Sequence, residues 1–232
     1  ILNTIVAETL SQAADILEPA ADFDEALNEL LKSWTSEHMR IIFNGDGYSK
    51  QWVVEAANRG LPNLSNTVDA TAVIADPKVI RLFEKHGVMT ETELLAREEV
   101  GYDIYSKQIN IEARTMIDMA KKQILPASIR YSTVVADSIN ALSQAGMPCE
   151  VQKELLTDIS SAMKEMRDAV RNLEHATDVA ITIRNPRERA CFYRDQVSAH
   201  FTDVRTPADK LENLVSKDMW PFPVYSDLLF NV

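Results

Sequence analysis

Apolar residues recur with helical spacing along most of the 232-residue chain, most regularly between Thr90 and Asn185. This stretch predicts three long helical segments folded back on one another. In the third segment the gaps between apolar positions alternate between four and three residues, at Leu155, Ile159, Ala162, Met166, Ala169, Leu173, Ala176 and Ala180. Such a 3.5-residue repeat is typical of a coiled-coil-like seam. The short turn at Gly146-Met147-Pro148 predicts that the second and third segments are antiparallel neighbours.

The first of these segments has a clear start and a predicted break. Thr90 and Glu93 fit a capping box, so a helix is expected to begin there and to run to about Gln123. Pro126 lacks a backbone N–H, and we expect it to kink or break the helix.

The pattern before Thr90 predicts shorter helices. One covers Ile1 to Glu18 and stops at Pro19, and a second begins near Asp22 or Asp24 and reaches Ile42. Local signals then predict a turn at Asn44-Gly45-Asp46-Gly47, a helix capped by Ser49 and ended by Gly60, a loop over 61–75, and a helix from Asp76-Pro77 to Gly87.

The C-terminal part is predicted to be helical from Arg187 to Val215, with a new short helix starting at Thr206-Pro207. Beyond Asp218 two prolines argue against a helix, so an extended, packed tail is expected, with a short strand near Leu228–Phe230. The fold class is therefore all-α: a long antiparallel helical bundle with additional packed helices and a Pro/aromatic-rich extended C-terminal tail. We expect divisions at 1–18, 19–89, 90–185 and 186–232.

Composition narrows the possible functions. The formal net charge of −11 argues against general binding to nucleic acid or to an anionic membrane, both of which need a basic face. No apolar run approaches the roughly 18–20 residues needed to span a bilayer. The first residues lack the basic start of a signal peptide. The chain has no initiator Met and is predicted to begin inside a helix, so we expect it to be a piece of a longer protein.

Few side chains have the spacing of a reactive site. The two cysteines, Cys149 and Cys191, favour buried free thiols in a cytosolic protein, with a disulfide as the alternative. The Gly45–Gly47 turn lacks both phosphate-loop patterns, so a plain turn is favoured. No histidine has the spacing of a metal-binding or catalytic pair. Each is interpreted as a hydrogen-bonded, partly buried side chain or as a surface side chain: His38, His86, His175 and His200.

Two charged groups remain as weaker candidates. The acidic pairs are Glu91 with Glu93, and Glu98 with Glu99. They could hold a cation, but a solvated helical face beside Arg97 is the favoured interpretation. Phosphate or carboxylate binding is one interpretation of the arginine cluster, and ion pairs are favoured: Arg184, Arg187, Arg189 and Arg194. The residues alone assign no catalytic, cofactor-binding or metal-binding residue.

Several stretches resemble one known family. The most specific is the tail Trp220-Pro221-Phe222-Pro223, which resembles the C-terminus of type III glutamine synthetases. Further stretches that resemble this family occur in the same order along the chain: Leu2–Glu8, Asn44–Ser49, Arg59–Leu64, His86–Leu94, Arg189–Asp195 and Arg205–Glu212. The segment Leu2–Glu8 resembles a late helix of the family's catalytic domain.

The resemblance implies ATP-dependent ligation of ammonia to glutamate through a γ-glutamyl phosphate, with Mg²⁺ or Mn²⁺, in a large, cytoplasmic, ring-stacked homo-oligomer. The family's metal ligands, nucleotide loop and substrate-binding arginines precede the position that matches Ile1. The resemblance therefore implies no catalytic, cofactor-binding or metal-binding residue in this chain, and ATP and the metal are expected only in the parent enzyme.

The leading hypothesis is thus a C-terminal helical region that braces the catalytic domain and contributes to subunit contacts. Its expected partners are its own catalytic domain and identical subunits, with no nucleic acid and no membrane. The alternative is a non-enzymatic helical interaction or regulatory module. A third possibility is a helical bundle that binds a cation or nucleotide.

Overall fold

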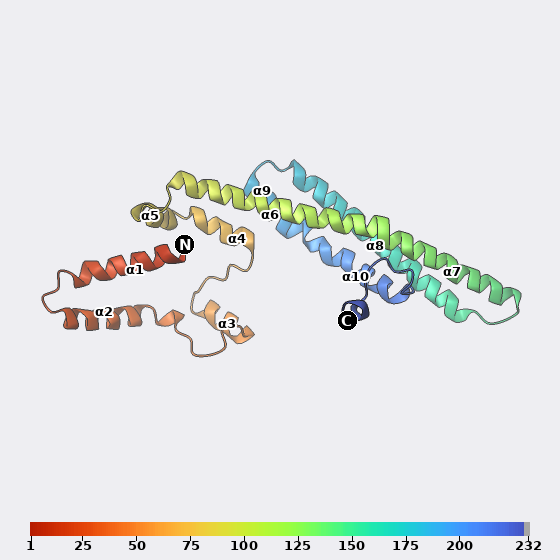
Figure 1. Ribbon diagram of the computed structural model, residues 1–232, viewed down its shortest axis with the longest axis horizontal. Coiled ribbons are helices and arrows are strands. Elements are labelled where there is room, and N and C mark those ends of the chain that lie inside the picture. The colour runs from red at the N-terminus through yellow and green to blue at the C-terminus, as the bar shows by residue number, and fades with distance from the viewer. Residues whose placement is uncertain (230–232) are drawn as a thin grey trace. The chain divides into compact units, whose positions relative to one another are not determined.

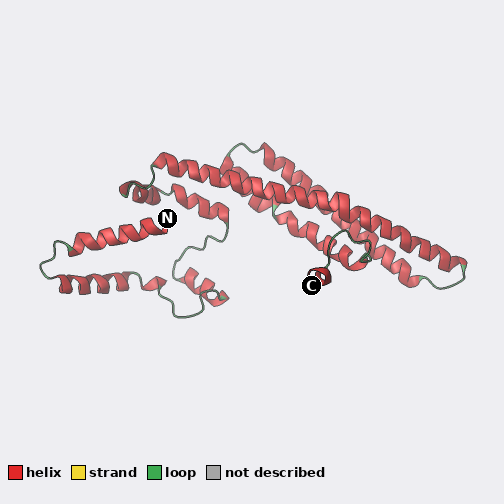
Figure 2. Cartoon of the chain, in the orientation of Figure 1, coloured by secondary structure: helices red, strands yellow, loops and turns green. Residues whose placement is uncertain are grey.

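The protein is described by a computed structural model that covers residues 1–229. Within that range the secondary structure is entirely helical, so the all-α prediction is confirmed there (Figure 2). The chain forms two compact units, Ile1–Gly101 and the residues from Tyr102 onward. One long helix, α6 (Glu91–Met119), begins in the first unit and continues into the second.

The first unit consists of short helices joined by turns (Figure 1). They are α1 (Leu2–Leu17), α2 (Phe23–Glu37), the 3₁₀ turn η1 (Met39–Ile41), α3 (Lys50–Asn58), α4 (Thr67–Ala72), the 3₁₀ turn η2 (Val73–Ala75), α5 (Pro77–Lys85) and the start of α6. Within this unit α1 packs against α2 and α5. The predicted loop over 61–75 is wrong in its second half, because Asn66 accepts a hydrogen bond from the Asp69 N–H and caps α4.

Local capping signals account for most helix boundaries in this unit. The Asp22 carboxylate accepts a hydrogen bond from the Glu25 N–H, which identifies it as the cap of α2. The capping box is also confirmed, since the Thr90 N–H donates to Glu93 Oε2 over 2.8 Å. Gly60 and Gly87 have φ angles of +70° and +60° just past α3 and α5, where a left-handed residue ends a helix.

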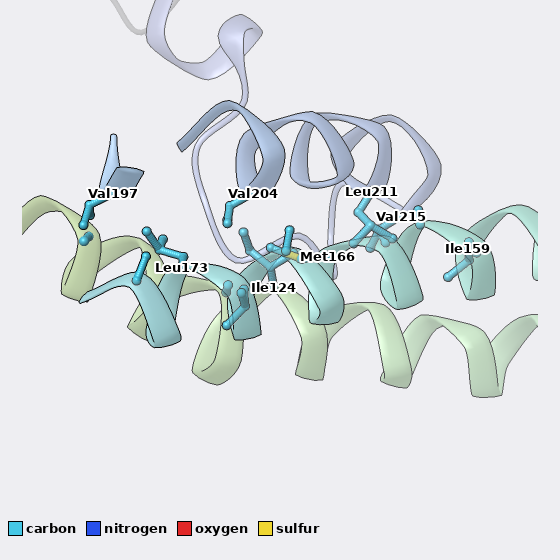
Figure 3. Close-up of a cluster of buried hydrophobic side chains, with 14 of the residues drawn as sticks. Ile124, Ile159, Met166, Leu173, Val197, Val204, Leu211 and Val215 are labelled. Atoms are coloured by element: carbon cyan, nitrogen blue, oxygen red, sulfur yellow. The ribbon is translucent and has the colours of Figure 1, made fainter. Parts of the chain in front are cut away.

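The second unit contains the hydrophobic core. After α6 it comprises the π-helical turn η3 (Ala120–Ile124), α7 (Leu125–Gln144), α8 (Glu150–Thr182), α9 (Pro186–Phe192), the π-helical turn η4 (Tyr193–Val197), α10 (Ala199–Leu214) and α11 (Tyr225–Leu229). The central helix α8 packs against both α7 and α10 (Figure 1). Figure 3 shows side chains of α8 and α10, including Met166, Leu173 and Leu211, meeting in one cluster.

The predicted seam of α8 is buried almost throughout. From Ile159 to Ala180 every seam residue is less than 9% exposed, and Ile159, Met166, Leu173 and Ala180 are completely buried. Completely buried aliphatic side chains contribute most to stability, because all of their apolar surface leaves water. The seam therefore holds the second unit together.

The chain does not break at Pro126, and no helix starts at Pro207. Pro126 lies in the first turn of α7, directly after η3, and the chain stays helical from Glu91 to Gln144. In η3 the Leu125 N–H donates to the carbonyl of Ala120, five residues earlier. Such a wide turn relieves the clash between a proline ring and the carbonyl four residues before it.

Pro207 does not start a helix, because it lies inside α10. Val204, Pro207 and Leu211 are buried on one face of α10, which packs against α8. Burial of this face stabilises a continuous helix despite the missing hydrogen bond.

The C-terminal tail also differs from expectation. Leu228 and Leu229 belong to the short helix α11 and not to a strand, while Phe230 lies outside the described residues. The preceding Trp220 is 9% exposed and packs on the core together with Phe222. Pro221 and Pro223 lie before α11, where they remove no helical hydrogen bond. Both cysteines are free thiols, Cys149 buried and Cys191 half-buried.

Candidate interaction surface

The first unit leaves most of its large apolar side chains in contact with solvent. Among residues 1–101 the buried apolar side chains are Leu30, Val68, Phe83 and Leu94. The same residues hold 19 of the 28 large apolar side chains that are exposed in the described part of the chain. Exposure on this scale is typical of a surface that contacts another protein body.

Helix α1 shows this most clearly. Its face towards α2 and α5 is built from Thr4, which is 5% exposed, and from the half-buried Ala7, Glu8 and Ser11. At 3.6 residues per turn, the opposite side carries an apolar stripe, while Ala13 and Leu17 of the same periodic pattern are half-buried. That stripe, here named the α1 apolar face, is exposed by 47% to 78% and consists of Leu2, Ile5, Val6, Leu10 and Ile16.

A charged cluster fixes α1 to the C-terminal end of α5. The Glu8 carboxylate lies 2.8 Å from Lys85 Nζ and 2.7 Å from His86 Nε2, and it accepts a hydrogen bond from the Gln12 amide. Lys85, Gln12 and His86, in that order of effect, lower the pKa of Glu8 to about 2. Glu8 is therefore ionised at neutral pH and positions α1, so that the α1 apolar face points away from α5.

A second cluster organises the chain between α2 and α3. Phe43 stacks on Trp52 with ring centroids 4.3 Å apart, and the Arg59 guanidinium lies 5.7 Å from the centre of the Trp52 ring. Arg59 also donates to the carbonyl of Ile42 over 2.8 Å and forms an ion pair with Glu55. These contacts attach the segment before the turn to α3.

The turn itself, residues 43–49, is closed by Asp46. Its carboxylate accepts from the Tyr48 N–H over 2.9 Å, and its carbonyl accepts from the Ser49 hydroxyl over 2.8 Å. A Cβ at Gly45 would lie 2.6 Å from Phe43 Cζ, so the Phe43 ring packs directly on the glycine. The turn holds Tyr48 at its tip with the side chain completely exposed, at 101%.

The remaining sequence candidates have structural partners or lie in solvent. In the arginine cluster, Arg189 pairs with Asp103 at 3.0 Å and Arg194 with Asp195 at 2.6 Å, which confirms ion pairing for these two. Arg184 and Arg187 are exposed. Of the acidic pairs, Glu93 caps α6, Glu91 and Glu99 are exposed, and Glu98 is half-buried.

The histidines are as dispersed as the sequence suggests. His86 contacts Glu8, His200 lies 3.1 Å from Asp203, and His38 and His175 are exposed. Over residues 1–229, no three His, Cys, Asp or Glu side chains come together in a way that would hold a metal ion. In that same range, no helix is both long enough and apolar enough to cross a membrane.

The second unit has one apolar groove of note, with a volume of about 310 Å³. Its walls include Met116, Met119, Met166 and Trp220, and Arg205 and Asp209 form an ion pair at its rim. Thioether and aromatic walls with a paired rim are suited to an apolar side chain. The carboxylate-bearing Glu212 also lines this groove.

Sequence reasoning missed both surface features of the first unit. The apolar stripe of α1 is visible in the sequence, yet its pattern does not tell which side neighbouring helices cover. The segment that carries Tyr48 is attached to α3 by Phe43, which stacks on Trp52, and by Arg59 at the C-terminal end of α3, which lies over the Phe43 ring. The sequence signal for the turn, Asn44-Gly45-Asp46-Gly47, does not indicate that Tyr48 is exposed.

Comparison with known proteins places these features in a family. Residues 26–143, just over half of the chain, match the family described as the glutamine synthetase C-terminal domain. The type-3 glutamine synthetase of Dictyostelium discoideum is 32% identical to this chain over 99% of the chain and 32% of its own length.

Two bacterial relatives give the same picture. The glutamine synthetase of Butyrivibrio fibrisolvens is 32% identical over 91% of this chain and 30% of its own length. That of Bacteroides fragilis (strain YCH46) is 30% identical over 99% of this chain and 33% of its own length. The chain therefore spans about a third of the length of the curated relatives that it matches.

Proposed function

Because the chain belongs to the glutamine synthetase C-terminal domain family, we propose that it is the C-terminal helical region of a glutamine synthetase of type III. In this role it braces the part of the polypeptide that carries the ligase site, and it contributes to contacts between identical subunits. ATP, Mg²⁺ or Mn²⁺, glutamate and ammonia bind elsewhere in the polypeptide, in a cytoplasmic homo-oligomer.

The observation that carries the proposal is the orientation of the α1 apolar face. A helix of a folded protein normally turns its apolar stripe towards the core. Here Leu2, Val6 and Leu10 are 78%, 56% and 65% exposed, while the side of α1 that packs contains Thr4 and Glu8. This arrangement supports a second protein body that covers the stripe. We infer that this body is the ligase part of the same polypeptide, for which α1 is the last helix.

Charged side chains of this chain have structural partners, and this supports a catalytic site that lies elsewhere in the polypeptide. Glu8, Glu93 and Arg189 have structural contacts that explain their presence: an ion pair between helices, a helix cap and a bridge to Asp103. We therefore assign these residues to positioning and assembly.

The test uses the intact polypeptide with Leu10→Asp, which puts a carboxylate in the centre of the α1 apolar face. Burial of an unpaired carboxylate is costly, so ligase activity and assembly should fall at least tenfold. The matched control is Val151→Asp, since Val151 is 74% exposed at the start of α8. Equal behaviour of the two variants in light scattering and activity assays would contradict docking through α1.

A second experiment tests where the chemistry takes place. The 232-residue chain, assayed alone for γ-glutamyl transfer with ATP, glutamate and Mg²⁺ or Mn²⁺, should give no turnover above the uncatalysed rate. Robust turnover would show that the site lies within these residues.

A further inference from the structure

Tyr48 has a large aromatic side chain that is fully exposed to solvent. Its exposed fraction of 101% means that the ring has no packing partner within the chain. The backbone beneath it is nevertheless fixed by the hydrogen bond from the Tyr48 N–H to Asp46 and by the bond from the Ser49 hydroxyl to the Asp46 carbonyl. A fixed backbone with an unused aromatic side chain is what a preorganised binding anchor requires.

The supports on either side of the turn strengthen this interpretation. Phe43 stacks on Trp52 before the turn, and Ser49 caps α3 after it by accepting from the Trp52 N–H over 3.2 Å. Both ends of the turn are therefore attached to the same tryptophan. A partner that binds Tyr48 has little loop entropy to remove, which favours affinity.

Charge distinguishes this segment from the rest of its unit. Residues 1–101 contain 8 Lys and Arg against 17 Asp and Glu, a formal charge of −9. Residues 39–59 contain three basic residues against two acidic ones, with Arg40 and Lys50 exposed on either side of the turn. The same stretch exposes apolar side chains, Met39, Ile41, Ile42, Val53 and Val54, by 44% to 62%. The segment thus combines an aromatic tip, an apolar surround and a local excess of positive charge.

We propose that Tyr48 inserts into a pocket of the ligase part of the same polypeptide and anchors the helical region there. A pocket complementary to this segment needs apolar walls, a hydrogen-bond acceptor for the phenol hydroxyl, and carboxylates at its rim to pair with Arg40 and Lys50. This inference rests on the proposed function, since it names a specific anchor of that docking. Attachment within one polypeptide makes the contact independent of protein concentration.

The first experiment measures the reactivity of Tyr48 in the intact polypeptide. Tetranitromethane nitrates accessible tyrosines, and peptide mass spectrometry reports the rate at each site. Nitration of Tyr48 should be at least tenfold slower in the native enzyme than in the same enzyme unfolded in urea. Equal rates would overturn the proposal. Protection that disappears on dilution would also overturn it, because it would identify a second copy as the partner.

The second experiment uses substitutions that the fold of the chain itself tolerates, since the Tyr48 ring touches nothing in it. Removal of a central aromatic anchor weakens docking at least about 30-fold. Tyr48→Ala should therefore raise hydrogen exchange of residues 39–59 in the intact enzyme by that factor. Tyr48→Phe should have a smaller effect, because it keeps the ring and loses only the hydroxyl. Ile181→Ala, at a half-exposed site in the second unit, is the control and should change nothing.

The outcomes separate this inference from the proposed function. If Leu10→Asp disrupts the enzyme while Tyr48→Ala leaves exchange unchanged, the anchor is wrong and docking through α1 stands. If Tyr48→Ala releases residues 39–59 while Leu10→Asp behaves like Val151→Asp, the anchor stands and docking through α1 is wrong.

Discussion

Oε2 of Glu8 lies 2.7 Å from Nε2 of His86, although 78 positions separate the two residues in the chain. Lys85 contacts the same carboxylate, so the C-terminal turn of α5 holds α1 through two neighbouring side chains. Glu84, which directly precedes Lys85 in α5, accepts a hydrogen bond from the Glu91 N–H over 3.1 Å and thereby contacts the start of α6. The end of α5 thus links α1 to the long helix.

This link predicts a specific pH dependence. The pKa of Glu8 is lowered from 4.5 to about 2, chiefly by Lys85. A lowered pKa in the folded state means that the ionised form stabilises the fold above pH 4.5, and that this contribution is lost as the pH falls towards 2. Glu8→Gln should therefore lower the thermal midpoint at pH 5 and have little effect at pH 2.

The measurement for Glu8 is thermal unfolding followed by circular dichroism between pH 2 and pH 5. Glu18→Gln provides the control, because Glu18 is an exposed carboxyl at the end of the same helix. A constant difference between Glu8→Gln and the wild type across this range would refute the assignment.

The close packing around Gly101 predicts that an added side chain at this position destabilises the first unit. A Cβ there would lie 2.9 Å from Cγ2 of Thr71, which is buried and donates its hydroxyl to the Thr67 carbonyl. Gly101→Ala should destabilise the protein by about 1–3 kcal/mol through overpacking, more than the up to ~1 kcal/mol gained in helix propensity.

A double substitution tests that explanation. Thr71→Ser removes Cγ2 and keeps the hydroxyl, so Gly101→Ala should become neutral or stabilising when combined with it. Urea unfolding of the four proteins of this cycle gives the coupling energy. Gly47→Ala is the matched control, since a Cβ at Gly47 has nothing within 4 Å. Additive effects of the two substitutions would show that the contact is not the cause.

The core of the second unit depends on the seam of α8. Leu173 is completely buried within it, so Leu173→Ala should cost about 2–5 kcal/mol of unfolding free energy. Ile181→Ala on the same helix removes a side chain that is 50% exposed, and it should cost less than about 1 kcal/mol. Denaturant unfolding of both variants checks the difference, and similar losses would argue against a core centred on α8.

The contacts of Arg59 predict that its guanidinium protects the backbone of the Tyr48 turn from hydrogen exchange. Its guanidinium donates to the Ile42 carbonyl and to Glu55 while lying over the Trp52 ring, a combination that an ammonium group does not reproduce. Arg59→Lys should speed hydrogen exchange of residues 42–49 by about tenfold, because one charge-assisted hydrogen bond is lost. Arg81→Lys, at an exposed position of α5, should leave this exchange unchanged.

The fold was predictable wherever a signal is local. Asp22, Ser49 and Thr90 cap their helices as expected, since a cap depends on three or four consecutive residues. Pro126 and Pro207 were not predictable in the same way, because a wide turn accommodates one and burial against α8 overrides the other. Neither effect is visible in the residues next to the proline.

The candidate surface was predictable only in part. The periodicity of α1 identifies Leu2, Val6 and Leu10 as one face, and helical geometry guarantees that they lie together. The direction of that face is set by Glu8, whose partners Lys85 and His86 are far away in sequence. Long-range ion pairs of this kind leave no periodic trace in a single sequence. The family was predictable because short motifs such as Trp220-Pro221-Phe222-Pro223 are recognised residue by residue, although the family-model match itself covers residues 26–143.

The π-helical turns η3 and η4 matter for how relatives are aligned. Each such turn holds one residue more than the α-helical turn that it replaces, and it shifts every following side chain around the helix axis. A relative that lacks the wide turn must therefore omit a residue near Ala120–Ile124 or Tyr193–Val197 to keep its downstream side chains in phase. We therefore expect single-residue gaps at these two places, inside otherwise unbroken helices, in an alignment with relatives that lack the wide turns.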